Sequence, residues 1–336
     1  MSGGGRRVPP GPVEAKEGYM SAVASRSRRS VLAVPASNSR FIEKARGLDA
    51  DAVFLDLEDA VAPAEKAAAR AGAAAALNAG GWGAKVRTVR VNALDTPWTY
   101  RDVIEVVEGA GGELDGLVLP KVTTPDHVRW LDTLLTQIEA ANGLEPGGIG
   151  VEAQIEDARG ALRADEIAAS SLRLESLVYG PADFMASVNM RTLVVGEQPP
   201  GYDAGDAYHY VLMRILLAAR ANGLQAIDGP YLQIRDVEAF RRSAGRTAAL
   251  GFDGKWVLHP LQVEAANDVY TPGQADYDHA ERILDAYEHA TEVERRGAVM
   301  LDEEMLDEAS RKMALVVAGK GRAAGLRRSA ESGGEA

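Results

Sequence analysis

Residues Val53–Ala60 read VFLDLEDA. The segment opens with apolar residues and contains no glycine or proline, which predicts a buried strand. Three carboxylates, Asp56, Glu58 and Asp59, come within four positions. In a parallel barrel the carboxyl end of a strand carries the chemistry, and clustered carboxylates must be solvated, paired or bound to a cation. The simpler alternative is a strand followed by a helix whose dipole these acids stabilise.

The composition limits the kind of protein. The chain has 336 residues, 46% of them apolar, which suits one large domain or a domain with an appendage. A formal net charge of −12 argues against general nucleic-acid binding, which needs basic patches. The sequence has no cysteine, so disulfides, thiolate catalysis and cysteine-based zinc sites are excluded. No apolar stretch reaches the length of a membrane span.

Both ends of the chain are rich in small and basic residues. Residues 1–29 lack the apolar centre of a secretory signal, which predicts a disordered leader. Residues 319–336 are mainly Gly, Ala, Arg and Ser, which predicts a flexible tail. We therefore expect a cytoplasmic protein.

Between these ends, apolar runs alternate with helical patterns. Eight such units predict a (β/α)₈ barrel over residues 30–272, with a doubly wound open sheet as the alternative. No G-x-G-x-x-G follows a predicted strand, which counts against a dinucleotide-binding fold. The predicted strands are Ser30–Pro35, Ala52–Leu57, Thr88–Leu94, Gly116–Val122, Gly150–Ile155, Leu174–Tyr179, Gln225–Ile227 and Lys255–Leu258.

Helical patterns follow most of the predicted strands. Asn38 or Ser39 is a predicted N-cap of the first helix. Two further helices, Gln274–Arg296 and Glu303–Ala318, exceed what a barrel needs, so residues 273–318 are a predicted lid or oligomer contact. The helices predicted around the barrel are Phe41–Leu48, Ala64–Leu77, Tyr100–Glu108, Pro125–Ala141, Ala158–Ser170, Ala207–Asn222 and Val237–Leu250.

Nearly every predicted strand ends in a polar or charged side chain. Taken singly, each has a structural alternative. Glu156 or Asp183 could be a charge that stabilises a helix N-terminus, His259 a hydrogen-bonded structural histidine, and Lys121 a solvated strand end. A Schiff-base role is a further alternative for Lys121. Together they favour a site at one rim. The set is Glu58, Asp59, Arg90, Asn92, Lys121, Glu156, Asp183, Asp228 and His259.

The residue types in this set favour a metal-assisted reaction. Carboxylates from different strands, with no cysteine and few histidines, suit Mg²⁺, which takes one or two protein carboxylates and keeps positions for substrate and water. Such an ion chelates an α-oxo or α-hydroxy acid and polarises its carbonyl. Arg90 suits binding of a carboxylate or stabilisation of an enolate oxygen.

The chain resembles the citrate lyase beta subunit and the HpcH/HpaI-type aldolases from about residue 29 to about residue 317. The longest matching run is VPASNSRFIEKARGLDADAVFLDLEDAVAP (34–63). One branch, the malyl-CoA/β-methylmalyl-CoA lyases, is similar in RVNALDTPWTYRDV (90–103), LPKV (119–122), QIED (154–157), YGPADFMAS (179–187), IDGP (227–230) and GFDGKWVLHPLQV (251–263).

This resemblance implies a (β/α)₈ barrel with a C-terminal extension, assembled as trimers or hexamers. It implies Mg²⁺, with Mn²⁺ as a substitute, held by Glu156 and Asp183. Arg90 matches the active-site arginine of the family, and Glu58 and Asp59 match acids that line the site.

The resemblance also assigns roles outside the acidic cluster. The segment GAVMLDEEMLDEA (297–309) is similar to a lid that packs over a neighbouring subunit and carries a catalytic aspartate, here Asp302. Arg40, Lys44 and Pro260 lie where the family contacts CoA, and basic groups near a helix N-terminus would suit its phosphates.

Two features depart from the family pattern. The family usually has a threonine after the metal-binding glutamate, whereas this chain has Asp157, which adds a negative charge. Residues 190–206 are fewer than the matching stretch of many malyl-CoA lyases, which leaves the shape of the acid pocket open.

The implied reaction is a reversible Claisen-type cleavage of a β-hydroxyacyl-CoA, L-malyl-CoA or β-methylmalyl-CoA, to acetyl-CoA or propionyl-CoA and glyoxylate. A malyl-CoA thioesterase or a citramalyl-CoA lyase on the same scaffold are the alternatives, and one methyl group discriminates weakly. A non-catalytic CoA-ester-binding subunit is the alternative from another class.

Overall fold

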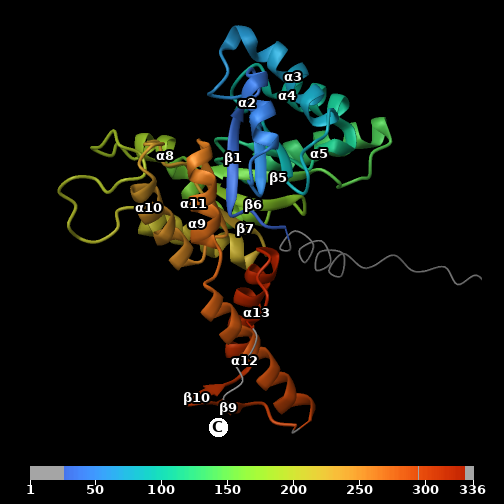
Figure 1. The fold of residues 1–336 in the computed structure, drawn as a ribbon. Helices are drawn as coiled ribbons and strands as arrows, with labels where there is room; N and C mark the ends of the chain where they lie inside the picture. The colour runs from blue at the N-terminus through green and yellow to red at the C-terminus, as the bar shows by residue number, and fades with distance from the viewer. Residues whose placement is uncertain (1–25, 294, 330–336) are drawn as a thin grey trace, which may run out of the picture. The chain divides into compact units, whose positions relative to one another are not determined.

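Eight parallel strands close into a barrel in the computed structural model, which describes residues 26–293 and 295–329 (Figure 1). Each strand pairs with the next along the chain, and Val31 of β1 lies opposite both Ala52 of β2 and Trp256 of β8. This closure confirms the predicted barrel and excludes the open sheet. The strands are β1 (Ser30–Pro35), β2 (Ala52–Asp56), β3 (Val86–Arg90), β4 (Gly116–Leu119), β5 (Gly150–Ile155), β6 (Leu174–Tyr179), β7 (Gln225–Asp228) and β8 (Gly254–Val257).

Alternate residues of the strands fill the inside of the barrel. Successive side chains of a strand point to opposite faces, and the inward ones make a cluster that is at most 3% exposed. Phe54 and Trp256 are its largest members, with ring centroids 4.3 Å apart. The barrel is therefore a packed core, and its chemistry is confined to the rim.

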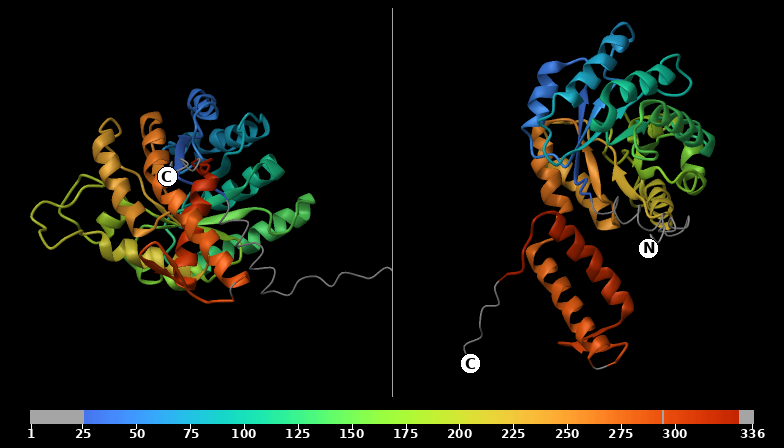
Figure 2. Two further views of the ribbon diagram at one scale, coloured as in Figure 1. Left: turned by 60° about the horizontal axis from the view of Figure 1, so that its bottom comes forward. Right: turned by 90° about the vertical axis from the view of Figure 1, so that its right-hand side faces the viewer.

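Helices surround the strands (Figures 1 and 2). The Asn38 side chain accepts a hydrogen bond from the Phe41 amide at the start of the first of them, which confirms one of the two predicted caps. The predicted helix over 158–170 is divided at Arg163, where the backbone leaves the helical region. The helices are α2 (Ser39–Arg46), α3 (Lys66–Asn78), α4 (Thr99–Ala110), α5 (Pro125–Asn142), α6 (Ala158–Leu162), α7 (Ala164–Ala168), α8 (Pro181–Ser187), α9 (His209–Ala221), α10 (Val237–Leu250) and α11 (Pro260–Tyr270), with short 3₁₀ turns at Pro63–Glu65 and Gly111–Glu113.

The third strand begins and ends earlier than its apolar pattern predicted. It spans Val86–Arg90, whereas the alternation suggested Thr88–Leu94. Val91 and Ala93 remain buried after the strand has ended, so their apolar character reflects packing of the loop. Arg90 is thereby the last residue of the strand, which places its side chain at the rim.

Residues 26–29 close the amino end of the barrel, so the predicted disordered leader is wrong for this part. Arg28 is fully buried and forms ion pairs with Glu152, at 3.3 Å, and with Glu175. It also donates a hydrogen bond to Gln225. These partners lie on β5, β6 and β7, and burial of the guanidinium is tolerated because its charge is paired with carboxylates. Residues 1–25 lie outside the described residues.

The chain divides into two compact units between Asn267 and Asp268. The second unit contains α12 (Gln274–Glu292), a hairpin of β9 (Val299–Leu301) and β10 (Glu304–Leu306), and α13 (Glu308–Ala323) (Figure 1). Its own core consists of Tyr277, Ala280, Ile283, Leu306, Ala314 and Ala318.

Two predictions for this unit are wrong. The helix predicted over Glu303–Ala318 begins only at Glu308, because residues 299–306 pair as a hairpin and Asp307 caps the helix. The helix then continues to Ala323, into the predicted flexible tail. Beyond it, Arg328 donates to Glu281 and Asp285 at 2.8 and 2.5 Å, so this part of the tail is also ordered.

Candidate active site

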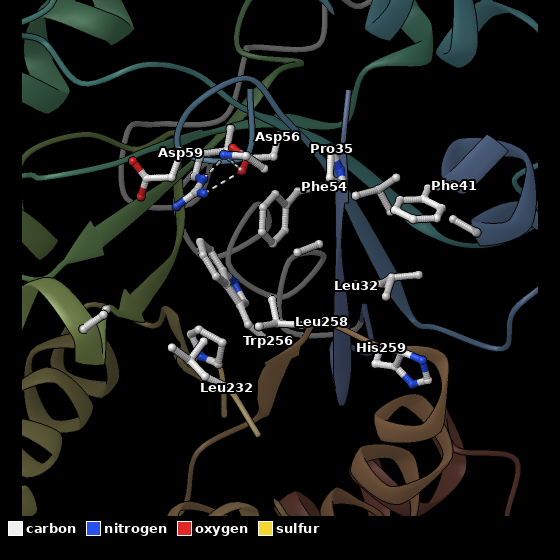
Figure 3. Close-up of a pocket in the computed structure, with 18 of the residues that line it drawn as sticks. Leu32, Pro35, Phe41, Phe54, Asp56, Asp59, Leu232, Trp256, Leu258 and His259 are labelled. Carbon is white, nitrogen blue, oxygen red and sulfur yellow. Dashed lines mark hydrogen bonds and ion pairs between the residues drawn. The ribbon is translucent and has the colours of Figure 1, made fainter. Parts of the chain in front are cut away.

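A pocket of about 620 Å³ opens at the carboxyl ends of the barrel strands (Figure 3). That volume lies within the range of small-molecule sites. Asp56 and Asp59 make one side acidic, whereas the opposite side carries Leu32, Phe41 and His259. The pocket therefore suits a ligand with one cationic or metal-chelated end and one apolar part.

Arg90 lies in this pocket at the end of β3. Its Nε and Nη2 donate to the two oxygens of Asp56, each at 2.7 Å (Figure 3), and its Nη1 lies 3.0 Å from Glu58 Oε2. The guanidinium carbon lies 5.6 and 5.4 Å from the ring centres of Phe54 and Trp256. Burial works against the charge, but the hydrogen bonds to Asp56 and the charges of Asp56, Glu58 and Asp59 raise the pKa of Arg90. Only two of its five N–H groups are bonded to Asp56, so others can bind a ligand.

Glu58 is held between two cations. Its Oε1 accepts a hydrogen bond from Lys121 Nζ at 2.9 Å, and its Oε2 faces Arg90. Burial raises the pKa of Glu58 in spite of both cations. Burial disfavours the charged form of Lys121, but the hydrogen bond to Glu58 and the charges of Glu58 and Asp59 raise its pKa. Because a Schiff base requires a neutral amine, this protonated lysine does not fit that role.

Glu156 follows β5 and carries the most perturbed carboxylate of the pocket. Its Oε1 accepts from the Lys121 amide at 2.7 Å and its Oε2 from Gln154 Nε2 at 2.5 Å. Burial, with the charges of Glu58 and Asp183, raises the pKa of Glu156 to about 8. The pocket thus concentrates more negative charge than its own cations neutralise.

That excess of negative charge fits a divalent cation. Asp183, on α8, is half-buried and lines the pocket beside Glu156. Within residues 26–293 and 295–329, no three acidic, histidine or cysteine side chains converge as a complete metal cage. Mg²⁺ needs no such cage, because it binds through one or two carboxylates and retains water. The donor set of Glu156 and Asp183 therefore fits Mg²⁺.

The barrel brings together most of the residues that the sequence singled out. Glu58 lies behind the pocket wall, where it contacts Arg90 and Lys121. Asp59 is exposed, with its Oδ1 3.9 Å from Lys121 Nζ. The predicted residues that line the pocket itself are Lys44, Asp59, Arg90, Glu156, Asp183, His259 and Pro260.

Besides Glu58 and Lys121, three barrel residues singled out as site candidates do not line the pocket. Arg40 is exposed on α2. Asn92 is buried and donates to Asp102 at 2.6 Å. Asp228 accepts from Lys255 at 2.5 Å, between β7 and β8. Asn92 and Asp228 are therefore engaged in buried structural contacts.

The two departures from the family pattern also lie outside the pocket lining. The Asp157 carboxylate caps α6 by accepting from the Arg159 amide at 2.7 Å, so its charge is engaged away from the pocket. No residue of 190–206 lines the pocket. That loop is instead attached through Glu197, whose Oε1 accepts from the Tyr231 hydroxyl at 3.0 Å.

Asp302 belongs to the second unit. It lies at the tip of the β9–β10 hairpin with φ +55°, and its side chain is 72% exposed. Arg282 Nη1, at 3.5 Å, is its ion-pair partner. A non-glycine residue in the left-handed region is uncommon, and such residues cluster at functional sites.

Sequence reasoning missed three residues of the site. Asp56 was noted in the acidic run but not given a role, although it is the main partner of Arg90. The period of two along the strand places it on the inward face with Phe54, so the signal was present. Gln154 and Trp256 also line the pocket, and nothing in their local sequence distinguishes them from core residues.

A closed (β/α)₈ barrel with a buried arginine and clustered carboxylates at its rim defines a barrel enzyme. The model of the HpcH/HpaI aldolase/citrate lyase family matches residues 29–260, and the chain belongs to this family. It is accordingly an enzyme of the carbon–carbon lyase type, which confirms the class that the sequence predicted.

Named relatives and a solved structure agree with this assignment. The L-malyl-CoA/β-methylmalyl-CoA lyase of Cereibacter sphaeroides is 40% identical over 301 residues, covering 87% of this chain and 94% of that protein. The citrate lyase subunit beta of Escherichia coli is 37% identical, covering 84% and 89%. The structure of CitE from Mycobacterium tuberculosis in complex with magnesium, acetoacetate and coenzyme A superimposes with a TM-score of 0.69 at 29% identity, covering 89% and 99%. No helix in the described part of the chain could span a membrane.

Proposed function

We propose that this protein cleaves a β-hydroxyacyl-CoA, L-malyl-CoA or β-methylmalyl-CoA, to acetyl-CoA or propionyl-CoA and glyoxylate. The observation that carries this proposal is the pairing of the Glu156–Asp183 carboxylates with Arg90 in one pocket. The 40% identity to L-malyl-CoA/β-methylmalyl-CoA lyase supports the substrate. The lyase reaction needs an anchor for a hydroxy acid and a group that stabilises an enolate, and these residues supply both.

The residues divide the reaction between them. Glu156 and Asp183 would hold Mg²⁺, which supplies a Lewis acid for the hydroxyl and carboxylate of the acyl group. Arg90, with N–H groups left after binding Asp56, would donate to the thioester oxygen as negative charge develops on it. The bond between the carbinol carbon and the α carbon breaks. The hydroxyl loses its proton and the α carbon gains one, so the reaction balances.

Asp302 is the proposed proton donor to the α carbon, supplied by a neighbouring copy of the chain in a trimer or hexamer. Its exposed carboxylate at a hairpin tip supports this role. Met300 and Met305 of the same hairpin are 59% and 67% exposed. Apolar side chains beside an exposed acid suit a segment that is covered in an assembly.

The first test identifies the products from malyl-CoA and Mg²⁺, with and without EDTA. Acetyl-CoA with glyoxylate, lost on adding EDTA, is the expected result. Free CoA with malate and no acetyl-CoA would identify a thioesterase and refute the lyase. Glu156→Ala should abolish Mg²⁺-dependent turnover, and retained activity would refute the metal assignment.

A mixing experiment tests whether sites are shared between copies. Asp302→Ala should lower turnover by about 10²-fold or more, the scale of acid–base catalysis, while Glu303→Ala, the adjacent exposed position, should not. Co-refolded Glu156→Ala and Asp302→Ala chains should recover activity, because each supplies what the other lacks. No recovery, with mixed assemblies present, would contradict a shared site.

A further inference from the structure

The site has an arginine half, which contains Arg90 and Glu58, and a proposed metal-binding half, which contains Glu156 and Asp183. β4 lies between these two halves. In the barrel order, β3 with Arg90 is its neighbour on one side, and β5, which leads to Glu156, is its neighbour on the other. Lys121 follows β4 and contacts residues of both halves. We propose that Lys121 is a positioning residue that fixes the arginine half of the site relative to the metal-binding half. This inference rests on the proposed function.

The side chain of Lys121 reaches toward the arginine half. Its Nζ donates to Glu58 Oε1 at 2.9 Å and lies 3.9 Å from Asp59 Oδ1. The other oxygen of Glu58 lies 3.0 Å from Arg90 Nη1. Lys121 therefore fixes the rotamer of a carboxylate that in turn orients the guanidinium, without itself having to touch the substrate.

The backbone of Lys121 reaches toward the metal-binding half. Its amide donates to Glu156 Oε1 at 2.7 Å. Its φ is +53°, in the left-handed region that side-chain-bearing residues adopt rarely and only where surrounding contacts hold them. This turn lets the amide bind Glu156 while the side chain extends back to Glu58, so one residue serves both neighbours.

The charge of Lys121 makes a distinctive prediction. Lys121 stands among Glu58, Asp59 and the metal-binding Asp183, whose charges all act on it. Removing its ammonium group leaves the pocket more negative, so the affinity for Mg²⁺ should stay constant or increase. Turnover should fall, because Glu58 loses the donor that fixes its rotamer and so orients the Arg90 guanidinium less well. A side chain that served only the fold would lower both together.

The experiment compares three variants with the wild-type enzyme. Lys121→Met has a similar length, no charge and the same backbone requirement. Lys121→Arg keeps the charge. Lys85→Met removes a lysine that precedes β3 and donates to the Arg46 carbonyl, away from the pocket, and serves as the control. Mg²⁺ alone is titrated calorimetrically into each protein, and kcat and KM are measured with malyl-CoA.

Lys121→Met should lose about 10- to 100-fold in kcat, the scale of a small misplacement of reacting groups, with an unchanged or lower Kd for Mg²⁺. Lys121→Arg should recover part of that loss, and Lys85→Met should match the wild type. If Lys121→Met is poorly folded, Lys121→Gly replaces it, because glycine adopts positive φ freely and retains the amide.

Two outcomes would overturn the inference. One is a kcat for Lys121→Met close to that of the wild type. The other is a weaker Mg²⁺ affinity that falls in proportion to kcat, since Lys121 would then act by supporting the metal ligand. Absence of malyl-CoA cleavage by the wild type would refute the proposed function instead, and the Mg²⁺ titration of Lys121→Met would still test the placement of the charge.

Discussion

Gly180→Ala should disable the proposed metal-binding half of the site through a steric effect alone. Gly180 links β6 to α8, and a Cβ there would lie 2.4 Å from both Cβ and Oε2 of Glu156 and 2.9 Å from Gln154 Nε2. Carbon atoms in contact are normally about 3.5–4.0 Å apart, so Glu156 would have to move by about 1 Å. Its Cβ cannot move alone, because β5 pairs with β6 and the Gly180 amide donates to the Ile155 carbonyl at 3.0 Å.

The magnitudes follow from this displacement. Overpacking of this kind lowers the free energy of unfolding by about 1–3 kcal/mol, equivalent to a fall of about 2–12 °C in Tm for a unit of this size. Metal–ligand distances tolerate only about 0.2 Å, so we expect at least a tenfold rise in the Kd for Mg²⁺ on the scale of metal-site disruption. Turnover should fall with it.

Calorimetric titration with Mg²⁺ and thermal unfolding followed by circular dichroism measure the two effects. Gly245→Ala is the matched control, because Gly245 is inside α10 and a Cβ there meets nothing within 4 Å. That variant should gain about 0.5–1 kcal/mol of stability. Wild-type Mg²⁺ affinity and Tm in Gly180→Ala would refute the geometry on which the metal assignment depends.

Three further variants test the stability of the two units. Glu139→Gln should lower the free energy of unfolding by about 3 kcal/mol, because the buried carboxylate accepts from Arg173 at 2.6 Å. Burial would raise the pKa of Glu139, but the hydrogen bond lowers it. In urea unfolding measured at several pH values, the difference from wild type should therefore shrink as pH falls below about 4. Arg28→Met should lower the free energy of unfolding by about 3–5 kcal/mol near neutral pH. Burial already raises the pKa of Glu152, so this loss of stability should be smaller near pH 5. A loss that does not change with pH would contradict this reasoning. Leu306→Ala should destabilise the second unit by about 2–5 kcal/mol, seen as faster limited proteolysis of that unit with unchanged barrel melting.

The barrel could be predicted from sequence because its strands are continuous apolar runs with charged ends. The apolar pattern of the sequence was less informative at residues that are buried but do not pair in a strand. Val91 and Ala93 extend the alternation of β3 although the strand ends at Arg90. Hydrophobic spacing reports burial, and it does not report which buried residues form the ladder.

The hairpin in the second unit was missed for a different reason. Glu, Met and Leu favour helices, so residues 303–306 gave a helical pattern, whereas β10 forms by pairing with β9. Its turn contains Asp302 at positive φ without a glycine to mark it. Pairing and turn geometry are decided by contacts across the chain, which local propensity does not contain.

The sequence predicted which residues form the site better than it predicted how those residues pair. The acids and Arg90 followed from their positions at strand ends. The pairing of Arg90 with Asp56 joins neighbouring strands, whereas that of Lys121 with Glu58 joins the ends of β4 and β2 across β3. The same charges could have been paired in several ways, and only the barrel's register selects one.

The burial of Arg28 also affects how the chain folds during synthesis. Its partner Gln225 lies 197 residues further along, which at about 5–20 residues per second is about 10–40 s of translation. Through that interval β1 has no β8 to pair with, and Arg28 lacks part of the network that buries its charge. A nascent chain with an open strand edge is a template for unwanted pairing. Chaperone dependence of this protein should therefore be concentrated in the period before the last barrel strand leaves the ribosome.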